Sequence, residues 1–335
     1  MSAQHDASAA MAQAKVFIDG EAGTTGLEIR ERLAQATDIS IKSLDAAQRK
    51  DTSARKALMA EVDLVVLCLP DDAAREAVAL ADELGGGAPR ILDASTAHRV
   101  APGWAYGFAQ LDKDQAGAIA AAKRVANPGC YSTGAIALIR PLVDAGLLPA
   151  DMALTINAVS GYSGGGRKMI EDYEAGTAPS FELYGLGMEH KHIPELAHYS
   201  GLTQRPIFLP SVGRFRQGML VSIPLHLDAL PGKPCLRDLE LALDAHYRGS
   251  DLISVVQEPA ASTTRLSAET LNGTDLMELF VFGRSAQRQA VLVASLDNLG
   301  KGAAGAAVQN IRLMLGLDAA GGARDQARKA ARVTT

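Results

Sequence analysis

The chain has 335 residues, a net charge of −5 and a hydrophobic content of 47%. This length is enough for about two domains of ordinary size, and the composition is typical of a soluble globular protein. The acidic balance and the lack of a long Lys/Arg run argue against nucleic acid as a partner. No apolar stretch reaches the roughly 18–20 residues that cross a bilayer, so a membrane is not an expected partner either.

Short apolar strands alternate with helical stretches in the first third of the chain. Strands are expected at residues 15–19, 39–44, 62–69, 90–93 and 124–126, and helices at residues 25–35 and 72–84. The run at residues 62–69 is almost continuously apolar, as in a parallel strand that is buried on both faces. This alternation predicts an α/β fold with a Rossmann-type, doubly wound parallel sheet.

The pattern changes near the middle of the chain. Longer strands are expected at residues 152–159, 219–227, 277–282 and 290–296, with a helix at residues 234–247. These elements indicate an α+β domain with a mostly antiparallel sheet. An Ala-rich amphipathic helix at residues 302–315 is expected to pack back on the first domain.

A glycine-rich loop follows the first expected strand. Gly20, Gly23 and Gly26 have G-x-x-G-x-x-G spacing. Glycines at a strand-to-helix turn let the backbone approach a pyrophosphate, which then rests on the helix N-terminus. The common fingerprint has Gly where Glu21 stands, and a tight turn that binds nothing is the alternative interpretation.

The residues after the second strand leave the choice between NAD and NADP open. Asp45 could bind the ribose hydroxyls, as NAD requires, or it could cap the following turn. Ser43, Arg49 and Lys50 lie close by in the sequence and could hold the 2′-phosphate of NADP.

Cys130 is the candidate nucleophile among the three cysteines. It follows Pro128-Gly129 and precedes an apolar, helix-like run at residues 135–143, which places it at a helix N-terminus. Because helix N-termini stabilise anions, we expect a lowered thiol pKa and a reactive thiolate. Cys68 and Cys235 are interpreted as small buried hydrophobes. A thiolate beside a nicotinamide cofactor predicts reduction of an acyl derivative through a thioester.

The number and spacing of the cysteines also bear on location and metal binding. An odd, low count argues against a disulfide framework and fits a reducing cytoplasm, which is the expected location. No CxxC or Cys/His spacing typical of zinc is present, and His190 with His192 is too small a ligand set, so no metal is expected.

Several segments together resemble the N-acetyl-γ-glutamyl-phosphate reductases of the shorter, type 2 subgroup. They lie, in order, at residues 16–26, 93–99, 104–107, 127–134, 163–168 and 190–195. The Asn-Pro-Gly-Cys-Tyr-Ser-Thr-Gly segment around Cys130 and the later His-x-His-x-Pro-Glu segment form a specific combination, and the resemblance covers residues 15–316. The wider superfamily includes aspartate-semialdehyde dehydrogenase. Residues 108–111 depart from the pattern, because relatives tend to read Pro-Glu-Leu there.

The resemblance implies that N-acetyl-glutamyl 5-phosphate is reduced by NADPH to N-acetyl-glutamate 5-semialdehyde and phosphate, a step of arginine biosynthesis. It also implies NADP as cofactor, a small-molecule substrate, and a homo-oligomer, dimer or tetramer, built through the sheet of the second domain. The alternatives are a related reductase of aspartyl phosphate, a substrate linked to a carrier protein, and a cofactor-binding regulator without turnover.

The expected domain organisation combines the elements with the resemblance. It consists of a disordered tail at residues 1–14, an NADP-binding Rossmann domain at 15–129, a catalytic and dimerisation domain at 130–297, a helix at 298–318 that returns to the Rossmann domain, and a flexible tail at 319–335. The first tail lacks the apolar core of a secretory signal.

Thioester chemistry needs a group that moves protons near the sulfur, and imidazole titrates near neutrality. His190 and His192 are the candidates. The family pattern favours His190, oriented by Glu195, with Tyr184 nearby and His192 pointing elsewhere.

The remaining expected contacts are with the cofactor and the substrate. The cofactor residues are Gly20, Gly23, Thr24, Thr25, Gly26, Ser43, Arg49, Ser95 and Asn298. The substrate residues are Arg99, Asn127, Ser163, Arg167, Lys168 and Arg216. At least two of the four basic side chains are expected to face the two anionic groups of the substrate.

Overall fold

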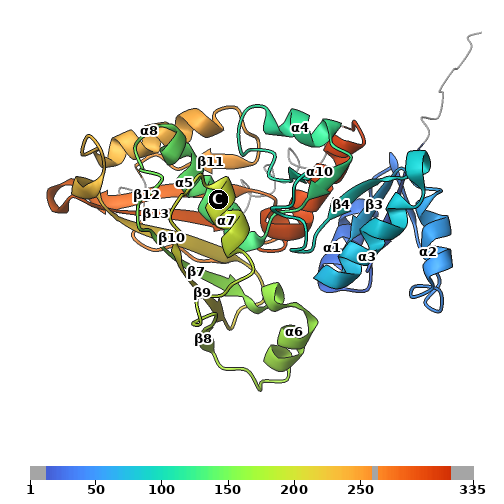
Figure 1. Cartoon of the computed structure of the whole chain (residues 1–335). Helices are drawn as coiled ribbons and strands as arrows, with labels where there is room; N and C mark the ends of the chain where they lie inside the picture. Colours follow the sequence, from blue (N-terminus) through green and yellow to red (C-terminus); the bar gives the residue numbers. More distant parts are fainter. Residues whose placement is uncertain (1–12, 259–262, 318–335) are drawn as a thin grey trace, which may run out of the picture.

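The computed structural model describes residues 13–258 and 263–317, and within them the chain forms two β-sheets that lie side by side (Figure 1). The predicted tails at residues 1–14 and 319–335 fall almost wholly outside the described residues.

Sheet A is a parallel sheet of six strands. Its strands are β1 (Ala14–Asp19), β2 (Ile39–Lys42), β3 (Leu64–Leu67), β4 (Arg90–Asp93), β5 (Ala105–Tyr106) and β6 (Arg124–Ala126). They lie in the order β2-β1-β3-β4-β6-β5, and every neighbouring pair is parallel. The chain runs outwards from β1 to β2 and then returns to β3 on the other side of β1. The carboxyl ends of β1 and β3 therefore border the crevice where such sheets bind ligands.

Helices cover both faces of sheet A. One face carries α2 (Thr52–Met59) and α3 (Asp71–Asp82), and the other carries α1 (Thr24–Leu33), α4 (Gln115–Ala121) and α10 (Gly305–Met314). Successive side chains of a strand point to opposite faces. In β1, Phe17 therefore packs with the first group, while Val16 and Ile18 pack with the second.

Sheet B is a mixed sheet of seven strands in the order β11-β12-β13-β10-β7-β9-β8. The strands are β7 (Thr155–Gly161), β8 (Phe181–Leu183), β9 (Ile207–Gly213), β10 (Met219–His226), β11 (Ile253–Val255), β12 (Met277–Arg284) and β13 (Gln289–Leu296). Its pairings are antiparallel except for β7 with β9 and β11 with β12.

Helix α5 (Cys130–Asp144) connects the two sheets. It begins shortly after β6 of sheet A and packs against β10 and β13 of sheet B and against α7 (Ile193–Tyr199) and α8 (Leu236–Tyr247). Almost every residue of α5 is buried. A helix that is apolar all round belongs in a core, so its first residue, Cys130, is held where the two sheets meet.

The chain finally returns to sheet A. A short π-helix at Gly300–Ala304 leads into α10, which packs on α1, α4 and β4. Arg90 of β4 donates to the carbonyls of Ala122, at 3.0 Å, and of Met314, which ties the ends of α4 and α10 to the sheet.

The predicted fold class is confirmed, and the longer predicted elements are present near their expected positions. The sequence patterns missed α2, α4, α6 (Gly166–Glu174), α7, β5, β8, β9 and β11. Most of these elements carry too few residues to show a clear period, and Pro210 interrupts the strand pattern of β9. The second sheet contains two parallel pairings that a strand pattern alone does not reveal. The predicted domain boundaries stay a prediction.

The packing of α10 leads to a stability prediction. Ile311 is fully buried among the side chains between α10 and sheet A. Ile311→Ala is expected to lower the free energy of unfolding by about 2–5 kcal/mol, because it removes buried methyl groups and leaves a cavity. Urea denaturation followed by circular dichroism measures the change. Leu241→Ala, at a side chain 46% exposed on α8, is the control and should change stability by less than about 0.5 kcal/mol.

Candidate active site

The turn before α5 presents Cys130 as the first residue of the helix. Gly129 is the N-cap, and its carbonyl accepts hydrogen bonds from the Thr133 N–H at 2.9 Å and from the Thr133 hydroxyl at 3.0 Å. A Cβ atom on Gly129 would lie 2.5 Å from both Arg99 Nη1 and His192 Nε2. Only glycine fits there, so the nucleophile turn packs directly on these two side chains.

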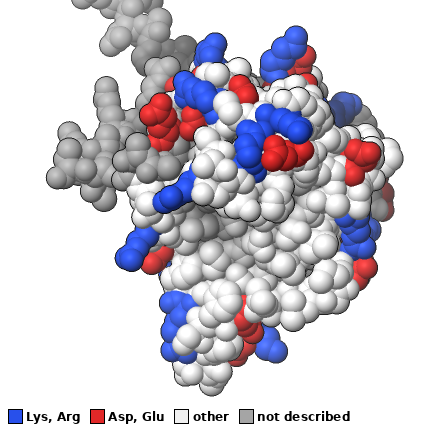
Figure 2. Space-filling view, turned by 90° about the vertical axis from the view of Figure 1, so that its left-hand side faces the viewer, with Lys and Arg blue, Asp and Glu red and all other residues white. Residues whose placement is uncertain are grey.

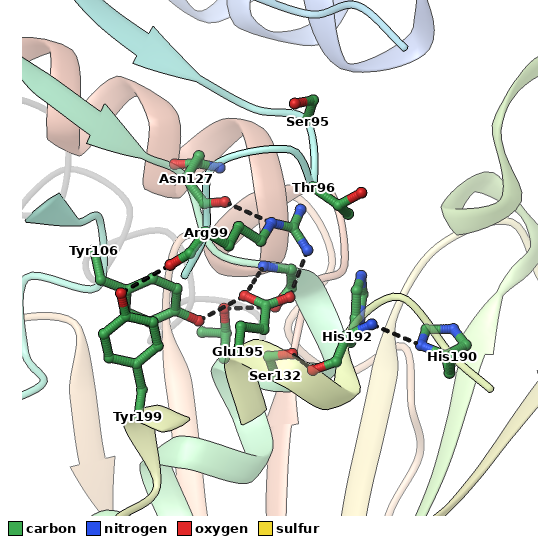
Figure 3. Close-up of polar contacts among 12 residues, drawn as sticks. Ser95, Thr96, Arg99, Tyr106, Asn127, Ser132, His190, His192, Glu195 and Tyr199 are labelled. Atoms are coloured by element: carbon green, nitrogen blue, oxygen red, sulfur yellow. Dashed lines mark hydrogen bonds and ion pairs between the residues drawn. The ribbon is translucent and has the colours of Figure 1, made fainter. Parts of the chain in front are cut away.

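A buried ion pair between Arg99 and Glu195 lies behind this turn (Figure 3). Arg99 Nη1 donates to Glu195 Oε1, and Arg99 Nε donates to the Asn127 carbonyl at 3.0 Å. Glu195 Oε2 accepts the Tyr106 hydroxyl at 2.8 Å and the Gly129 N–H at 3.1 Å. Both oxygens of Glu195 are therefore used to hold Arg99 and the nucleophile turn.

Two tyrosines close one side of this network. The rings of Tyr106 and Tyr199 stack with 3.7 Å between their centroids, and the Tyr199 hydroxyl donates to the Arg99 carbonyl at 2.8 Å (Figure 3). The stack ties α7 to β5, and the hydroxyl bond ties α7 to the loop after β4.

His190 and His192 lie together beside the network. The His192 N–H donates to His190 Nδ1 at 3.1 Å, which leaves Nε2 as the free nitrogen of His190. The ring centroids are 4.8 Å apart, and the Tyr184 ring lies 5.7 Å from His190. His192 Nδ1 is buried and has no hydrogen-bond partner among the described residues.

Burial keeps both imidazoles neutral. It lowers the pKa of His190 to about 4, and the nearby charges of Lys191 and Arg99 act in the same direction. Burial and the Arg99 guanidinium lower the pKa of His192 well below its usual value.

Cys130 opens into a cleft of about 170 Å³ whose walls come from both sheets. The residues from the side of sheet A are Thr24, Thr25, Ala94, Arg99, Asn127, Pro128 and Gly129. Those from the side of sheet B include Tyr131, Ser163, Gly164, Gly166, Tyr184, His190, Lys191, His192 and Asn298. Gly302, before α10, approaches so closely that its Cβ would lie 2.8 Å from Cys130 Cβ.

The thiol of Cys130 does not have the low pKa that the sequence predicts. Burial raises its pKa to about 11, although Arg99, the Tyr131 N–H and Lys191 act in the opposite direction. Glu195 also raises it, because its carboxylate charge disfavours a second negative charge on the sulfur. The helix N-terminus is present as predicted, but desolvation outweighs it.

The glycine-rich loop has the backbone geometry of a cradle. Gly20 has φ of 91°, a left-handed conformation that favours glycine, and its Cβ would lie 2.3 Å from the Cys68 carbonyl. The Cβ of Gly26 would lie 2.5 Å from the Gly20 carbonyl. Gly23 is the N-cap of α1. The loop therefore packs tightly against the residue that follows β3 and leads directly into the N-terminus of α1, the position where a pyrophosphate binds in such loops.

Beside this loop, Glu21 is surrounded by donors. Its Oε2 accepts from Arg30 at 2.6 Å and from the Ser43 hydroxyl at 2.9 Å, and its Oε1 accepts from Arg49 at 2.9 Å. Glu21 and Arg49 line a pocket with Gly20, Ala22, Leu44 and Leu69. Ser43 and Arg49 are the predicted phosphate-binding residues, and Arg30 joins them from α1.

Comparison with known proteins places this geometry in a family. Residues 130–298 match the family model described as "Semialdehyde dehydrogenase, dimerisation domain". Over 308 residues the chain is 54% identical to the N-acetyl-gamma-glutamyl-phosphate reductases of Brucella ovis and Brucella suis, covering 90% of this chain and 99% of each relative. The chain belongs to the N-acetyl-γ-glutamyl-phosphate reductase family.

Solved structures share the fold of this N-acetyl-γ-glutamyl-phosphate reductase family member at low identity. Aspartate semialdehyde dehydrogenase II of Vibrio cholerae superposes with a TM-score of 0.67 at 14% identity, covering 90% of this chain and 98% of that chain. The Candida albicans enzyme, solved with NADP, has a TM-score of 0.64 at 16% identity over the same shares.

Some predicted site residues of this reductase family member lie elsewhere than expected. Glu195 was expected to orient His190 but instead holds Arg99, Tyr106 and the Gly129 N–H. His192 was expected to point away, yet it lines the same cleft as His190. The start of α7 at Ile193 explains both differences. His192 is the N-cap of this helix and is buried, and the first turn of the helix points Glu195 into the core.

The predicted basic residues are also only partly brought together. Of the four, Arg99 alone lines the cleft, and the expectation that at least two of them face the substrate stays a prediction. Arg167 on α6 donates to the Ala22 carbonyl, Arg216 pairs with Glu174 at 3.1 Å on the surface, and Lys168 is exposed. Helix α6 packs with few buried residues, so its charged side chains stay in solvent.

The other predicted cofactor and substrate residues also lie partly in the cleft and partly outside it. Asn127, Ser163 and Asn298 line the cleft, and Asn298 Nδ2 donates to the Ser163 hydroxyl at 2.9 Å. Ser95 turns its hydroxyl back onto Asp93 at 2.8 Å and is not part of the cleft wall.

Sequence reasoning missed Lys191, Tyr106, Tyr199 and Arg30. The only available signal for Lys191 was its position between the two histidines. The other three become site residues through packing of distant segments.

The raised thiol pKa leads to a prediction for alkylation. The rate of iodoacetamide reaction at Cys130 should rise about tenfold per pH unit between about pH 7 and pH 10, because only the thiolate reacts and its fraction grows below a pKa of about 11. Peptide mass spectrometry separates Cys130 from the exposed Cys235. A rate that levels off below about pH 8 would show that the thiolate already exists at neutral pH.

Proposed function

We propose that the chain is an N-acetyl-γ-glutamyl-phosphate reductase that converts N-acetyl-glutamyl 5-phosphate to N-acetyl-glutamate 5-semialdehyde and phosphate in arginine biosynthesis. One observation carries the proposal. Thr24 and Thr25 of the glycine loop line the same cleft as Cys130 and His190, so a cofactor on the loop and an acyl group on the sulfur would meet. The name carried by relatives at 54% identity supports the choice of substrate.

The cofactor is NADP, which supplies the hydride when it is bound as NADPH. The glycine loop fits its pyrophosphate, because it turns sharply from β1 into the N-terminus of α1, with Gly20 at φ 91° and Gly23 as the N-cap. Arg30, Ser43 and Arg49 gather around one position at the rim of the pocket. Asp45, the residue that would favour NAD, lies on an exposed turn closed by a Gln48 N–H to Asp45 carbonyl bond of 2.8 Å.

The reaction begins at the Cys130 sulfur. The thiolate attacks the acyl carbonyl, the bond to phosphate breaks, and a thioester forms on Cys130. The Tyr131 N–H favours the thiolate, and N–H groups at the start of α5 are placed to hold the carbonyl oxygen. One such donor contributes about 3 kcal/mol to transition states of this kind.

Lys191 and Arg99 are the cations nearest the reacting atoms. Arg99 is tied to Glu195, so Lys191 is the cation that is free to follow the leaving phosphate. Both act to lower the thiol pKa. A substrate that carries negative charge into the cleft also favours protonation of the imidazoles.

His190 moves the protons. In the resting tautomer Nδ1 accepts the His192 N–H, so the neutral ring carries its proton on Nε2. To take the thiol proton at Nε2, the ring first moves its own proton to Nδ1 and gives up the His192 hydrogen bond. The resulting imidazolium then donates from Nε2 to the thiohemiacetal oxygen. His192 is less suited, because its ring is enclosed and faces Arg99, which makes its imidazolium costly.

The active form is a homo-oligomer, a dimer or tetramer, built through sheet B. The matched family model is described as a dimerisation domain. The face of sheet B opposite α5 and α8 carries the exposed side chains of Ile207, Pro224 and Val291. Figure 2 looks at the side where β12 and β13 end and shows charged side chains gathered around a broad uncharged centre. Such a patch is suited to burial between subunits.

We also place the enzyme in the cytoplasm. All three cysteines are free thiols, which fits a reducing compartment. Within the described ranges no helix has the length and apolar character to span a membrane.

The direct test is NADPH oxidation, followed at 340 nm, with enzymatically made N-acetyl-glutamyl phosphate. Cys130→Ser is expected to lower kcat by at least about 10³-fold, because a hydroxyl in this cleft has no base strong enough to ionise it. Binding of NADPH, measured by fluorescence, should be unchanged. Aspartyl phosphate and NADH are run in parallel; preferred turnover of aspartyl phosphate, or substantial activity of Cys130→Ser, would contradict the proposal.

The two histidines are separated by a matched pair of variants. His190→Asn should lower kcat about 10²–10⁴-fold, the usual contribution of a general acid–base, and remove the acidic limb of the kcat pH profile. His192→Asn should keep that limb, because His190, the group that titrates, is still present. If His192→Asn removes the limb and His190→Asn keeps it, the two roles are reversed.

A further inference from the structure

Glu21 is the acidic residue at the rim of the pocket bounded by the glycine loop. Its carboxylate is 11% exposed and receives hydrogen bonds from Arg30, Ser43 and Arg49, which come from α1, the end of β2 and the loop after it. The Glu21 carboxylate thus connects α1, the end of β2 and the loop after β2. In the common fingerprint of such loops, glycine occupies the position of Glu21.

These donors are the ones that an NADP 2′-phosphate would need. Ser43 has a single hydroxyl proton, and it is donated to Glu21 Oε2 at 2.9 Å. Arg30 Nη1 is shared between Glu21 at 2.6 Å and Ser43 at 2.7 Å, and Arg49 Nη2 is donated to Glu21 at 2.9 Å. A phosphate at this position therefore meets donors that are already bound to a carboxylate.

We propose that Glu21 is a specificity-determining residue that competes with the 2′-phosphate of NADP for Ser43, Arg30 and Arg49. The inference rests on the proposed function, because it assumes that the nicotinamide cofactor binds along this loop. When the phosphate binds, Glu21 loses its hydrogen bond to at least one guanidinium, Arg30 or Arg49, and that guanidinium donates to the phosphate instead. Glu21 thereby weakens the binding of 2′-phosphorylated nucleotides and leaves 2′-hydroxyl nucleotides almost unaffected.

The distribution of burial and charge supports competition rather than simple scaffolding. Arg30 and Arg49 are 44% and 45% exposed, so both can swing toward a second anion, whereas Glu21 is largely enclosed. The other acid of the loop region, Asp19, is already paired with Arg55 at 2.6 Å and draws on none of these donors. A phosphate and the Glu21 carboxylate sharing two guanidinium groups would repel each other.

Competition also has a consequence for turnover. The oxidised cofactor must leave after each cycle, and it carries the same 2′-phosphate as the reduced one. A carboxylate that takes back the Ser43, Arg30 and Arg49 donors favours this release.

The test measures binding of nucleotide fragments that carry no nicotinamide. Titration calorimetry is run with 2′,5′-ADP and with 5′-AMP on the wild-type chain, Glu21→Gln and Glu21→Ala. Both variants are expected to bind 2′,5′-ADP about tenfold more tightly, equivalent to about 1.4 kcal/mol, with little change for 5′-AMP. Glu31→Gln, at an exposed carboxylate on the helix that follows the loop, α1, controls for net charge and should change neither affinity.

Each outcome decides one question. Equal or weaker binding of 2′,5′-ADP by the variants would overturn the inference and make Glu21 a scaffold for the arginines. Thermal unfolding of the two variants checks that a weaker affinity does not come from a damaged fold. If the wild-type chain binds neither 2′,5′-ADP nor NADPH, the proposed function itself fails, which is a separate result.

Discussion

The buried ion pair between Arg99 and Glu195 is the interaction on which the cleft depends. Arg99 comes from the loop after β4 of sheet A, and Glu195 comes from α7, which packs on α5 beside sheet B. Glu195 also accepts the Gly129 N–H, so the same carboxylate holds the turn that presents Cys130. Removing one partner of a buried pair leaves an uncompensated charge and typically costs 3–5 kcal/mol, so the arrangement of the sheets and the position of the sulfur are coupled.

The same ion pair shapes the electrostatics of the thiol. Taken alone, Arg99 would favour a thiolate, but Glu195 offsets its charge and burial adds a further penalty. The result is a thiol whose pKa lies near 11 and two histidines that are neutral. A thiol with a pKa this high is slow to be alkylated or oxidised at neutral pH, because the thiolate is the reactive form.

Close approaches of backbone to side chain are a second constraint on the site. Gly129 is packed under Arg99 and His192, and Gly302 lies against Cys130. Because Gly302 stands just before α10, the helix that returns to sheet A also touches the nucleophile. The cofactor loop shows the same principle, since Gly20 sits against the Cys68 carbonyl at the end of β3. The glycine loop and the surroundings of Cys130 thus both depend on close contacts at glycine positions.

Local patterns in the sequence were enough to identify the parallel sheet, the glycine loop and Cys130 at a helix N-terminus. Each of these depends on neighbouring residues, through backbone dihedrals, side-chain periodicity and turn chemistry. Tertiary structure decided the partners: Glu195 meets Arg99 from 96 positions away, and Glu21 meets Arg49 from 28 positions away. It also decided the thiol pKa, because desolvation depends on what packs over the sulfur rather than on the residues beside it in the chain.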